Sequence, residues 1–351
     1  MKNGRIQIAD RVVGAGSPCL VIAEAGVNHN GDKDTAMALV DAAAGAGADA
    51  VKFQTFRTDS LVTRWAPKAA YQRKTTRESE SQYEMLRRLE LPGGVYRELA
   101  SHCRDLGILF LSTPFDAQSA DLLQEIGVPA FKVPSGEVTN LPLLRHIGSK
   151  GKPVILSTGM ADIGEVSRAV ETLEEAGSRD MVILHCVSSY PAQPDEMNLR
   201  AMDTLRQAFG YPVGLSDHTL GFEISLAAVA LGAAVLEKHF TLDRNLPGPD
   251  HGASLEPEEL ASMVKAVRKV EAALGSGLKE PSAAERDTAR SVRKSLVAAQ
   301  FIAAGTILEG DMIAVRRPGT GLPPARLPDL IGRKALVDIQ EGQLLAEEMV
   351  Q

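Results

Sequence analysis

Short apolar segments recur along the first three quarters of the chain, separated by longer amphipathic ones. Each is rich in β-branched or aromatic residues, which is typical of strands buried on both faces of a parallel sheet. We predict eight such strands: CLVIAEAG (19–26), AVKFQTF (50–56), ILFLSTPF (108–115), AFKVPSG (130–136), PVILSTG (153–159), MVILHCV (181–187), VGLSDHT (213–219) and AVLEKHF (234–240).

Helical spacing of apolar residues marks most of the intervening segments. The clearest are 32–48, 92–107 and 256–274, and the last has acidic residues in its first turn and basic ones later, as the helix dipole favours. Eight strand–helix units over about 250 residues predict a (β/α)8 TIM barrel. A doubly wound sheet is the alternative, but it needs fewer strands and usually a glycine fingerprint. The sequence GAG at 14–16 lacks the third glycine and precedes the first strand.

The connection after the second predicted strand, residues 57–86, is unusually long, polar and charged. In a barrel it lies at the C-terminal face, where substrates bind. It is therefore either part of the binding site or a solvent-exposed loop without a role in binding.

The alternation of predicted strands and helices ends near residue 275, which indicates that a second domain follows. We predict a barrel over 1–275, a linker over 276–290 and a small β domain over 291–351. The last region contains two related sequences, IAAGTILEGDMI (302–313) and IQEGQLLAEEMV (339–350), which predict a pseudo-symmetric β module.

Composition narrows the class of protein. Charged residues make up 24% of the 351 residues and the formal net charge is −7, which argues against a nucleic-acid binder. Cys19, Cys103 and Cys186 are scattered and form no CxxC pair, as expected in a reducing compartment. The N-terminus has no signal-peptide core, and the longest apolar run is too short to cross a bilayer. We therefore expect a cytoplasmic protein without a membrane partner.

Polar side chains follow or end most of the predicted strands. Residues two apart on a strand face the same side, and the C-terminal ends of barrel strands meet at one face. Burying so many polar groups costs several kcal/mol each unless they are partnered, so the cluster predicts a site. Its members are Glu24, Lys52, Gln54, Lys132, Ser135, Glu137, Ser157, His185, Ser188, Tyr190, Ser216, His218, Glu237 and His239.

The residue types indicate the chemistry of this site. Lys52 and Lys132, together with several serine hydroxyls, suit a small anion that carries both a phosphate and a carboxylate. His218 and His239 lie on neighbouring predicted strands and can share one divalent metal, such as Mn²⁺, Fe²⁺ or Co²⁺. Asp250, in the loop that follows, adds a carboxylate for acid–base work or hydroxyl binding. His251 is a weaker candidate ligand than the histidine pair, and we expect the charge of Lys238 to point toward the helices as a structural group.

Two other classes of function stay open on these grounds. A Schiff-base aldolase could use Lys52, Lys132 or Lys238 as its nucleophile, although that chemistry does not need a histidine pair. A carbohydrate- or ice-binding protein built around the C-terminal module is the third hypothesis, but it would not need a polar barrel mouth.

Several motifs closely resemble the bacterial sialic acid synthase family over nearly the whole chain. They are IAEAGVNHNGD, VKFQTF, STPFD, KVPSGEVTNLPLL, LSTGM, HCVSSYP, GLSDHTLG and EKHFTLDRNLPGPDHGAS. The C-terminal region resembles the antifreeze-like (SAF) domain of the β-clip type. The resemblance implies a transferase that condenses phosphoenolpyruvate, an N-acetylmannosamine-type aldose and water into a nine-carbon 2-keto sugar acid and phosphate. It also implies a divalent cation, usually Mn²⁺, with Mg²⁺ or Co²⁺ as alternatives.

The resemblance also implies roles for individual residues. It assigns the metal to His218 and His239, and places Glu24 and Glu137 near the aldehyde and the reacting carbons. It assigns phosphoenolpyruvate binding to Lys52, Lys132, Ser135, Ser157, Ser188 and Ser216. It assigns sugar binding to Gln54, Tyr190, Asp250 and, in a domain-swapped homodimer, Arg317 of the partner subunit, with the adjacent Arg316 as the alternative.

The identity of the sugar is the main alternative that the resemblance leaves open. N-acetylmannosamine would give N-acetylneuraminate, whereas 2,4-diacetamido-2,4,6-trideoxymannose would give N,N'-diacetyllegionaminate. A phosphorylated sugar fits the bacterial members of the family less well. We expect residues 66–76 to face the distal end of the sugar.

Overall fold

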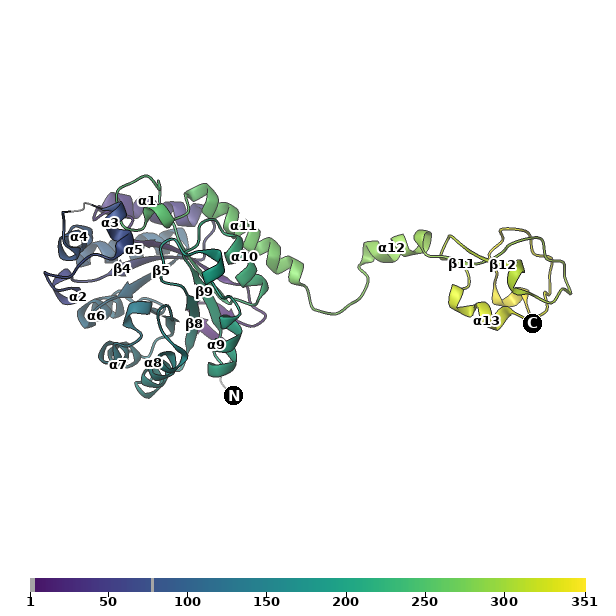
Figure 1. The fold of residues 1–351 in the computed structure, drawn as a ribbon, viewed down its shortest axis with the longest axis horizontal. Coiled ribbons are helices and arrows are strands. Elements are labelled where there is room, and N and C mark those ends of the chain that lie inside the picture. The colour runs from purple at the N-terminus through teal and green to yellow at the C-terminus, as the bar shows by residue number, and fades with distance from the viewer. Residues whose placement is uncertain (1–3, 77–78) are drawn as a thin grey trace. The chain divides into compact units, whose positions relative to one another are not determined.

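The computed structural model describes residues 4–76 and 79–351. The chain divides into two compact units, Met1–Gly275 and Ser276–Gln351. Figure 1 colours the chain from purple at the N-terminal strands to yellow in the C-terminal unit.

An eight-stranded parallel sheet forms the centre of the first unit (Figure 1). Its order is β5-β4-β3-β10-β9-β8-β7-β6, and the two end strands β5 and β6 lie against each other, so the sheet curves into a barrel. Every predicted strand is confirmed: β3 (Leu20–Gly26), β4 (Ala50–Thr55), β5 (Leu109–Pro114), β6 (Phe131–Val133), β7 (Val154–Ser157), β8 (Met181–Cys186), β9 (Val213–Asp217) and β10 (Val235–His239).

Helices follow each strand and cover the outside of the sheet (Figure 1). A large apolar core fills the layer between sheet and helices. The helices are α1 (Lys33–Gly45), α5 (Gly93–Leu106), α6 (Ala117–Ile126), α7 (Leu141–Gly148), α8 (Ile163–Glu175), α9 (Ala201–Phe209), α10 (Glu223–Ala230) and α11 (Pro257–Leu274), with the short α2 (Thr58–Leu61), α3 (Ala70–Thr75) and α4 (Gln82–Leu89) after β4. Short 3-10 turns are η1 (Ser135–Glu137), η2 (Pro194–Glu196) and η3 (His251–Ala253).

The inward positions of the strands change from apolar to polar along the barrel axis. On β3, Leu20 and Ile22 belong to an apolar cluster, and the next residue on that face is Glu24. The same step occurs from Ile155 to Ser157 on β7. The N-terminal half of the interior is therefore a packed core, and the C-terminal half carries the chemistry.

An N-terminal hairpin, which the sequence analysis does not predict, completes that core. Strands β1 (Arg5–Ile8) and β2 (Arg11–Gly14) pair antiparallel. Their residues Ile6, Ile8 and Val13 pack into the apolar cluster at the starts of the barrel strands. The hairpin thus closes the end of the barrel opposite the polar residues.

The second unit is a small β module with its own apolar core. Strands β11 (Ser295–Ala298) and β12 (Ile313–Arg316) pair antiparallel, and Ile302 bridges to Ile339, the equivalent position of the second repeat. Turns η4 (Gly310–Met312) and η6 (Glu347–Met349) occupy matching places in the two repeats, which agrees with the predicted pseudo-symmetry. Turn η5 (Pro324–Arg326) and α13 (Leu327–Leu330) lie between them.

The predicted linker contains a helix, α12 (Ala283–Val292). Ser282 caps its N-terminus by accepting from the backbone of Glu285, whose side chain bonds back to Ser282, so this is a capping box. The S-x-x-E pattern in PSAAERD predicts this start, and the Gly/Pro/Ser content of the region obscures it. Among the helices of the described ranges, none is long and apolar enough to cross a membrane.

Candidate active site

A cavity of about 560 Å³ opens at the C-terminal ends of the barrel strands. Its lining combines polar residues of the strand ends and the loops that follow them with mostly apolar residues of the connection after β4. The polar residues include Glu24, Lys52, Gln54, Lys132, Ser135, Ser157, Cys186, Ser188, Tyr190, Ser216, His218, Glu237, His239 and Asp250. Apart from Glu137 and His185, all members of the strand-end cluster predicted from the sequence line this one cavity.

Two lysines and two carboxylates form the floor of the cavity. Lys52 Nζ lies 2.7 Å from a carboxylate oxygen of Glu24 and 3.6 Å from one of Glu237, and it donates to Thr113 Oγ1 at 2.9 Å. Lys132 Nζ lies 3.4 Å from the same Glu237 oxygen. All four charged side chains are almost fully buried. Each charge has lost most of its hydration, and the opposite charges nearby compensate for that loss.

The four charged groups of the floor differ in the direction in which their pKa values are shifted. Burial would raise the pKa of Glu237, but Lys132 and Lys52 outweigh it and lower that pKa, so Glu237 stays ionised. Burial raises the pKa of Glu24 to about 7 against the opposing effect of Lys52. Burial also lowers the pKa of Lys132, whereas the nearby carboxylates raise that of Lys52 despite its burial. Glu24 is consequently the floor group best placed to exchange a proton near neutral pH.

A cradle of hydroxyl groups surrounds Gly159, which follows β7. The backbone N–H of Gly159 donates to Ser135 Oγ at 2.9 Å. A Cβ at this position would lie 2.2 Å from Ser188 Oγ, 2.8 Å from Ser135 Oγ and 3.2 Å from Cys186 Sγ. Ser157 Oγ is buried nearby on β7 and makes no hydrogen bond. Such a cradle of hydroxyl and backbone donors beside two lysines suits an anion.

The predicted histidine pair comes together beside this floor. The ring centroids of His218 and His239 are 5.4 Å apart. His218 Nδ1 lies 2.7 Å from the carbonyl oxygen of Val187, an acceptor, so Nδ1 carries the proton and Nε2 keeps a lone pair. His239 Nδ1 is buried without a hydrogen-bond partner. Burial, and the repulsion that a second positive charge would meet from His218 when that ring is protonated and from Lys52, hold the pKa of His239 well below its ordinary value, so its ring is neutral.

These observations fit a divalent cation held by two imidazoles, with substrate and water as the other ligands. Among the residues that the structure describes, no three or more His, Cys, Asp and Glu side chains are grouped so that they could hold a metal ion. The fit therefore rests on the pair alone.

Asp250 lines the cavity, and buried residues next to it hold its loop in place. His251 Nδ1 lies 2.7 Å from Thr241 Oγ1, and its Nε2 lies 3.2 Å from Asn30 Nδ2. His251 thus has a structural place away from the histidine pair. Burial raises the pKa of Asp250 to about 6.

Lys238 points away from the cavity, as predicted. Its Nζ bonds Asp217 at 3.0 Å and the carbonyl oxygen of Thr219, and its side chain is fully buried. This removes it as a candidate nucleophile at the barrel mouth.

The connection after β4 contributes many residues to the cavity lining, so it is part of the binding site and not only a solvent-exposed loop. It has a small core of its own in which Phe56, Met85 and Leu89 pack together with Val27. Helix α3 brings Tyr71 and Gln72 to the cavity. The Tyr71 ring stacks on that of Tyr190 with centroids 4.8 Å apart, and Tyr190 in turn lies 4.2 Å from the His218 ring.

Three predicted residues lie elsewhere. Leu184 faces the barrel interior, so the adjacent His185 points to the other side of β8, where its Nε2 lies 2.6 Å from the carbonyl oxygen of Met197. Glu137 is absent from the described cavity lining, and its carboxylate accepts from Asn140 Nδ2 at 2.6 Å. Arg317 is exposed in the second unit, directly after β12. Its predicted contact with a sugar in a partner subunit stays a prediction.

Three residues of the site carry no assigned role in the sequence analysis. The i, i+2 spacing of Glu237 and His239 places Glu237 on the inward face, but only the fold shows that it bridges two lysines from other strands. Tyr71 and Gln72 belong to residues 66–76, which we expect to face the sugar, but which side chains of that segment reach the cavity depends on tertiary packing.

A sequence profile of the NeuB family matches residues 39–279, and one of the SAF domain matches residues 293–351. The chain belongs to the NeuB family. This confirms the predicted resemblance, the barrel with its C-terminal SAF domain, and the prediction that the protein is an enzyme.

Relatives in the NeuB family match over nearly the full chain. The N,N'-diacetyllegionaminic acid synthase of Campylobacter jejuni is 48% identical over 93% of this chain and 99% of its own length. The synthase of the same name from Legionella pneumophila is 45% identical, covering 96% of both chains. The solved N-acetylneuraminic acid synthetase of Leptospira borgpetersenii is 36% identical, with a TM-score of 0.71 over 81% of this chain and 94% of that one.

Proposed function

We propose that this NeuB-family enzyme condenses phosphoenolpyruvate with an N-acetylated amino aldose and water to give a nine-carbon 2-keto sugar acid and phosphate. The observation that carries the proposal is the combination, in one cavity, of a buried lysine pair, a hydroxyl cradle and a histidine pair. Each matches a different part of this reaction. The lysines and serines suit phosphoenolpyruvate, and the histidines suit a cation beside the aldehyde.

The residues of the chain act on the reaction as follows. Lys52 and Lys132 hold the carboxylate and phosphate of phosphoenolpyruvate, and the hydroxyl groups of Ser135, Ser157, Ser188 and Ser216 complete its binding. The enol carbon attacks the open-chain aldehyde, and water adds to the other enol carbon. The tetrahedral product loses phosphate and leaves the ketone. Glu24, with its raised pKa, exchanges the protons that these steps require.

A divalent cation, Mn²⁺ in first place with Mg²⁺ or Co²⁺ as alternatives, would be held by His218 and His239 and would polarise the aldehyde oxygen as a Lewis acid. Gln54, Tyr190 and Asp250 line the sugar side of the cavity in this proposal. Arg317 of the partner subunit would complete it in a domain-swapped homodimer.

Two sugars are candidates, and two observations favour 2,4-diacetamido-2,4,6-trideoxymannose over N-acetylmannosamine. Two of the relatives reported above are named N,N'-diacetyllegionaminic acid synthases. The cavity lining also includes many apolar residues, namely Val27, Leu61, Val62, Met85, Leu86, Leu89 and Phe115. An apolar wall suits a methyl group and a second acetamido group better than a hydroxymethyl or a phosphate.

The deciding experiment is a product assay by mass, with phosphoenolpyruvate, Mn²⁺ and a panel of sugars. The panel contains both candidates and N-acetylmannosamine 6-phosphate. We expect phosphate release and a nine-carbon acid, with the diacetamido sugar preferred. A chelator should stop turnover and Mn²⁺ should restore it. Full activity in chelator, or a pyruvate adduct trapped on a lysine by borohydride, would instead favour the Schiff-base mechanism.

A further inference from the structure

Helix α3 presents two side chains to the cavity from outside the barrel. Gln72 is 9% exposed, and the Tyr71 ring continues a stack that runs through Tyr190 to His218. The far end of this stack is one of the two histidines of the proposed metal site. A ligand whose reacting end lies beside His218 would therefore extend its other end toward α3.

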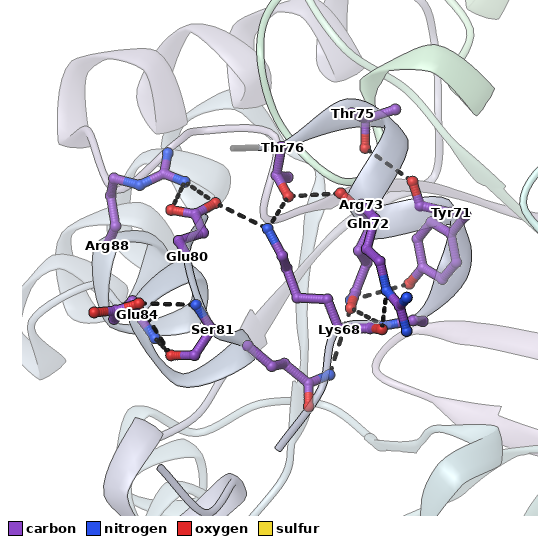
Figure 2. A network of polar contacts seen from close by, with 12 residues as sticks. Lys68, Tyr71, Gln72, Arg73, Thr75, Thr76, Glu80, Ser81, Glu84 and Arg88 are labelled. Carbon is purple, nitrogen blue, oxygen red and sulfur yellow. Dashed lines mark hydrogen bonds and ion pairs between the residues drawn. The ribbon is translucent and has the colours of Figure 1, made fainter. Parts of the chain in front are cut away.

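A polar network holds α3 in this position (Figure 2). Lys68 Nζ donates to Thr76 Oγ1 at 2.9 Å and lies 3.7 Å from a carboxylate oxygen of Glu80. Glu80 also accepts from Arg88 of α4 at 3.0 Å. Lys68 precedes α3 and Thr76 follows it, so the network ties both ends of the helix to α4.

The Gln72 amide is oriented by its surroundings. The backbone N–H of Ala69 donates to Gln72 Oε1 at 3.0 Å, which identifies that atom as the oxygen. The Nε2 group makes one long contact of 3.4 Å, with the Tyr71 hydroxyl. An NH₂ group has two hydrogens to donate, so Gln72 retains donor capacity toward the cavity.

The neighbours of this amide are mostly apolar. Leu61, Met85 and Leu86 line the same part of the cavity, and Gln82 Nε2 lies 3.5 Å from Gln72 Oε1. A single amide in an apolar wall pairs well with an uncharged carbonyl that carries a methyl group, which is an acetamido substituent. A charged substituent would lose its water here without a compensating partner among the described lining residues on this wall.

We propose that Tyr71 and Gln72 determine which amino sugar the enzyme accepts, with Gln72 donating to an acetamido oxygen at the distal end of the sugar and Tyr71 forming the apolar surface for its methyl group. Lys68 is a positioning residue that acts by holding α3 in place. The inference rests on the proposed function and deepens it.

The test compares sugars on variants of the full-length enzyme, with Mn²⁺ and saturating phosphoenolpyruvate. The variants are Gln72→Leu, Tyr71→Ala, Tyr71→Phe and Lys68→Met. Thr75→Ala is the matched control, because Thr75 is an exposed residue of the same helix. For each variant, kcat and KM are measured for the diacetamido sugar and for N-acetylmannosamine, and KM is measured for phosphoenolpyruvate.

We expect Gln72→Leu to raise KM for the diacetamido sugar about tenfold, the effect of losing one hydrogen bond. Its KM for N-acetylmannosamine should change less, and its KM for phosphoenolpyruvate should stay within about twofold, which also shows that the variant is folded. Tyr71→Phe should resemble the wild type, and Tyr71→Ala should lose sugar discrimination. Lys68→Met should follow Gln72→Leu, with recovery in Lys68→Arg.

Equal losses for both sugars, or an unchanged ratio of their kcat/KM values, would overturn the specificity role and leave the proposed function standing. Absence of phosphate release by the wild type with every sugar of the panel would overturn the proposed function and this inference with it.

Discussion

The glycine at the centre of the hydroxyl cradle offers a direct test of anion binding. In Gly159→Ala, the new methyl carbon would lie 2.2 Å from Ser188 Oγ and 2.8 Å from Ser135 Oγ. Carbon and oxygen atoms that are not bonded do not approach closer than about 3 Å, so both hydroxyls must move outward by a few tenths of an ångström or more. The φ of Gly159 is outside the left-handed region, so the perturbation is purely one of space.

The expected magnitude combines two effects. Overpacking of this kind costs about 1–3 kcal/mol. Displacing Ser135 Oγ from the Gly159 N–H, now 2.9 Å away, forfeits a hydrogen bond worth about 1 kcal/mol. This sum of about 2–4 kcal/mol is a loss of folding stability. The rise in KM for phosphoenolpyruvate comes from the displaced hydroxyl groups and is about tenfold for each hydrogen bond to the anion that is lost. If Ser188 rotates away instead, the cradle loses a hydroxyl and binding weakens for that reason.

The assay is steady-state phosphate release at saturating sugar, with binding of phosphoenolpyruvate measured separately by calorimetry. Gly94→Ala is the control, because a methyl group on this exposed residue of α5 would meet no atom within 4 Å. It should leave both quantities unchanged. A Gly159→Ala enzyme with wild-type affinity for phosphoenolpyruvate would refute the cradle as the phosphate site.

Three further predictions concern stability and metal dependence. Burial lowers the pKa of His29 from 6.5 to about 4, so the folded and unfolded states bind protons equally above pH 6.5, and the unfolded state binds more as the pH falls toward 4. Stability should therefore drop by about 3 kcal/mol from this residue over that window, and urea unfolding of His29→Gln should show a correspondingly shallower loss. Lys238→Met should destabilise the fold by about 3–5 kcal/mol because it leaves Asp217 buried and unpaired, and Lys238→Met combined with Asp217→Asn should recover much of that loss in thermal melts, whereas additive losses would contradict the pairing. His239→Gln should weaken Mn²⁺ binding in a calorimetric titration without changing the melting temperature of the metal-free protein by more than a few degrees, and undiminished Mn²⁺ affinity would remove His239 from the proposed metal site.

The barrel could be predicted well from the sequence because its signal is local and repeated. Each strand is a short apolar run, and on several strands the first inward polar residue follows an apolar one by two positions, as with Ile22 and Glu24. That spacing alone places most of the lysines, serines and histidines on one face. The outward orientation of the Lys238 side chain could be predicted for the same reason, because its neighbours Glu237 and His239 face inward.

The remaining features depend on contacts between distant segments. The bridge that Glu237 makes between Lys52 and Lys132 joins three strands, and the stack of Tyr71 on Tyr190 joins helix α3 to the loop after β8. The hairpin β1–β2 has strands of only four residues each, too short for a clear alternating pattern. Helix α12 shows how a linker-like composition can hide a capping box.

The apolar lower half of the barrel has a consequence for the charges above it. Among the described residues, those of the hairpin and the cluster of Ile22, Ile155 and Val235 fill the interior below the lysine–carboxylate floor with apolar side chains, so we expect the floor to be hydrated through the mouth. A substrate that fills the mouth removes this source of hydration. The local dielectric constant then falls on every side at once, and the attraction between the lysines and the substrate anion strengthens as the substrate arrives. The enzyme thus needs no large rearrangement of the barrel to create a low-dielectric reaction chamber, because the packed end of the fold has already built half of it.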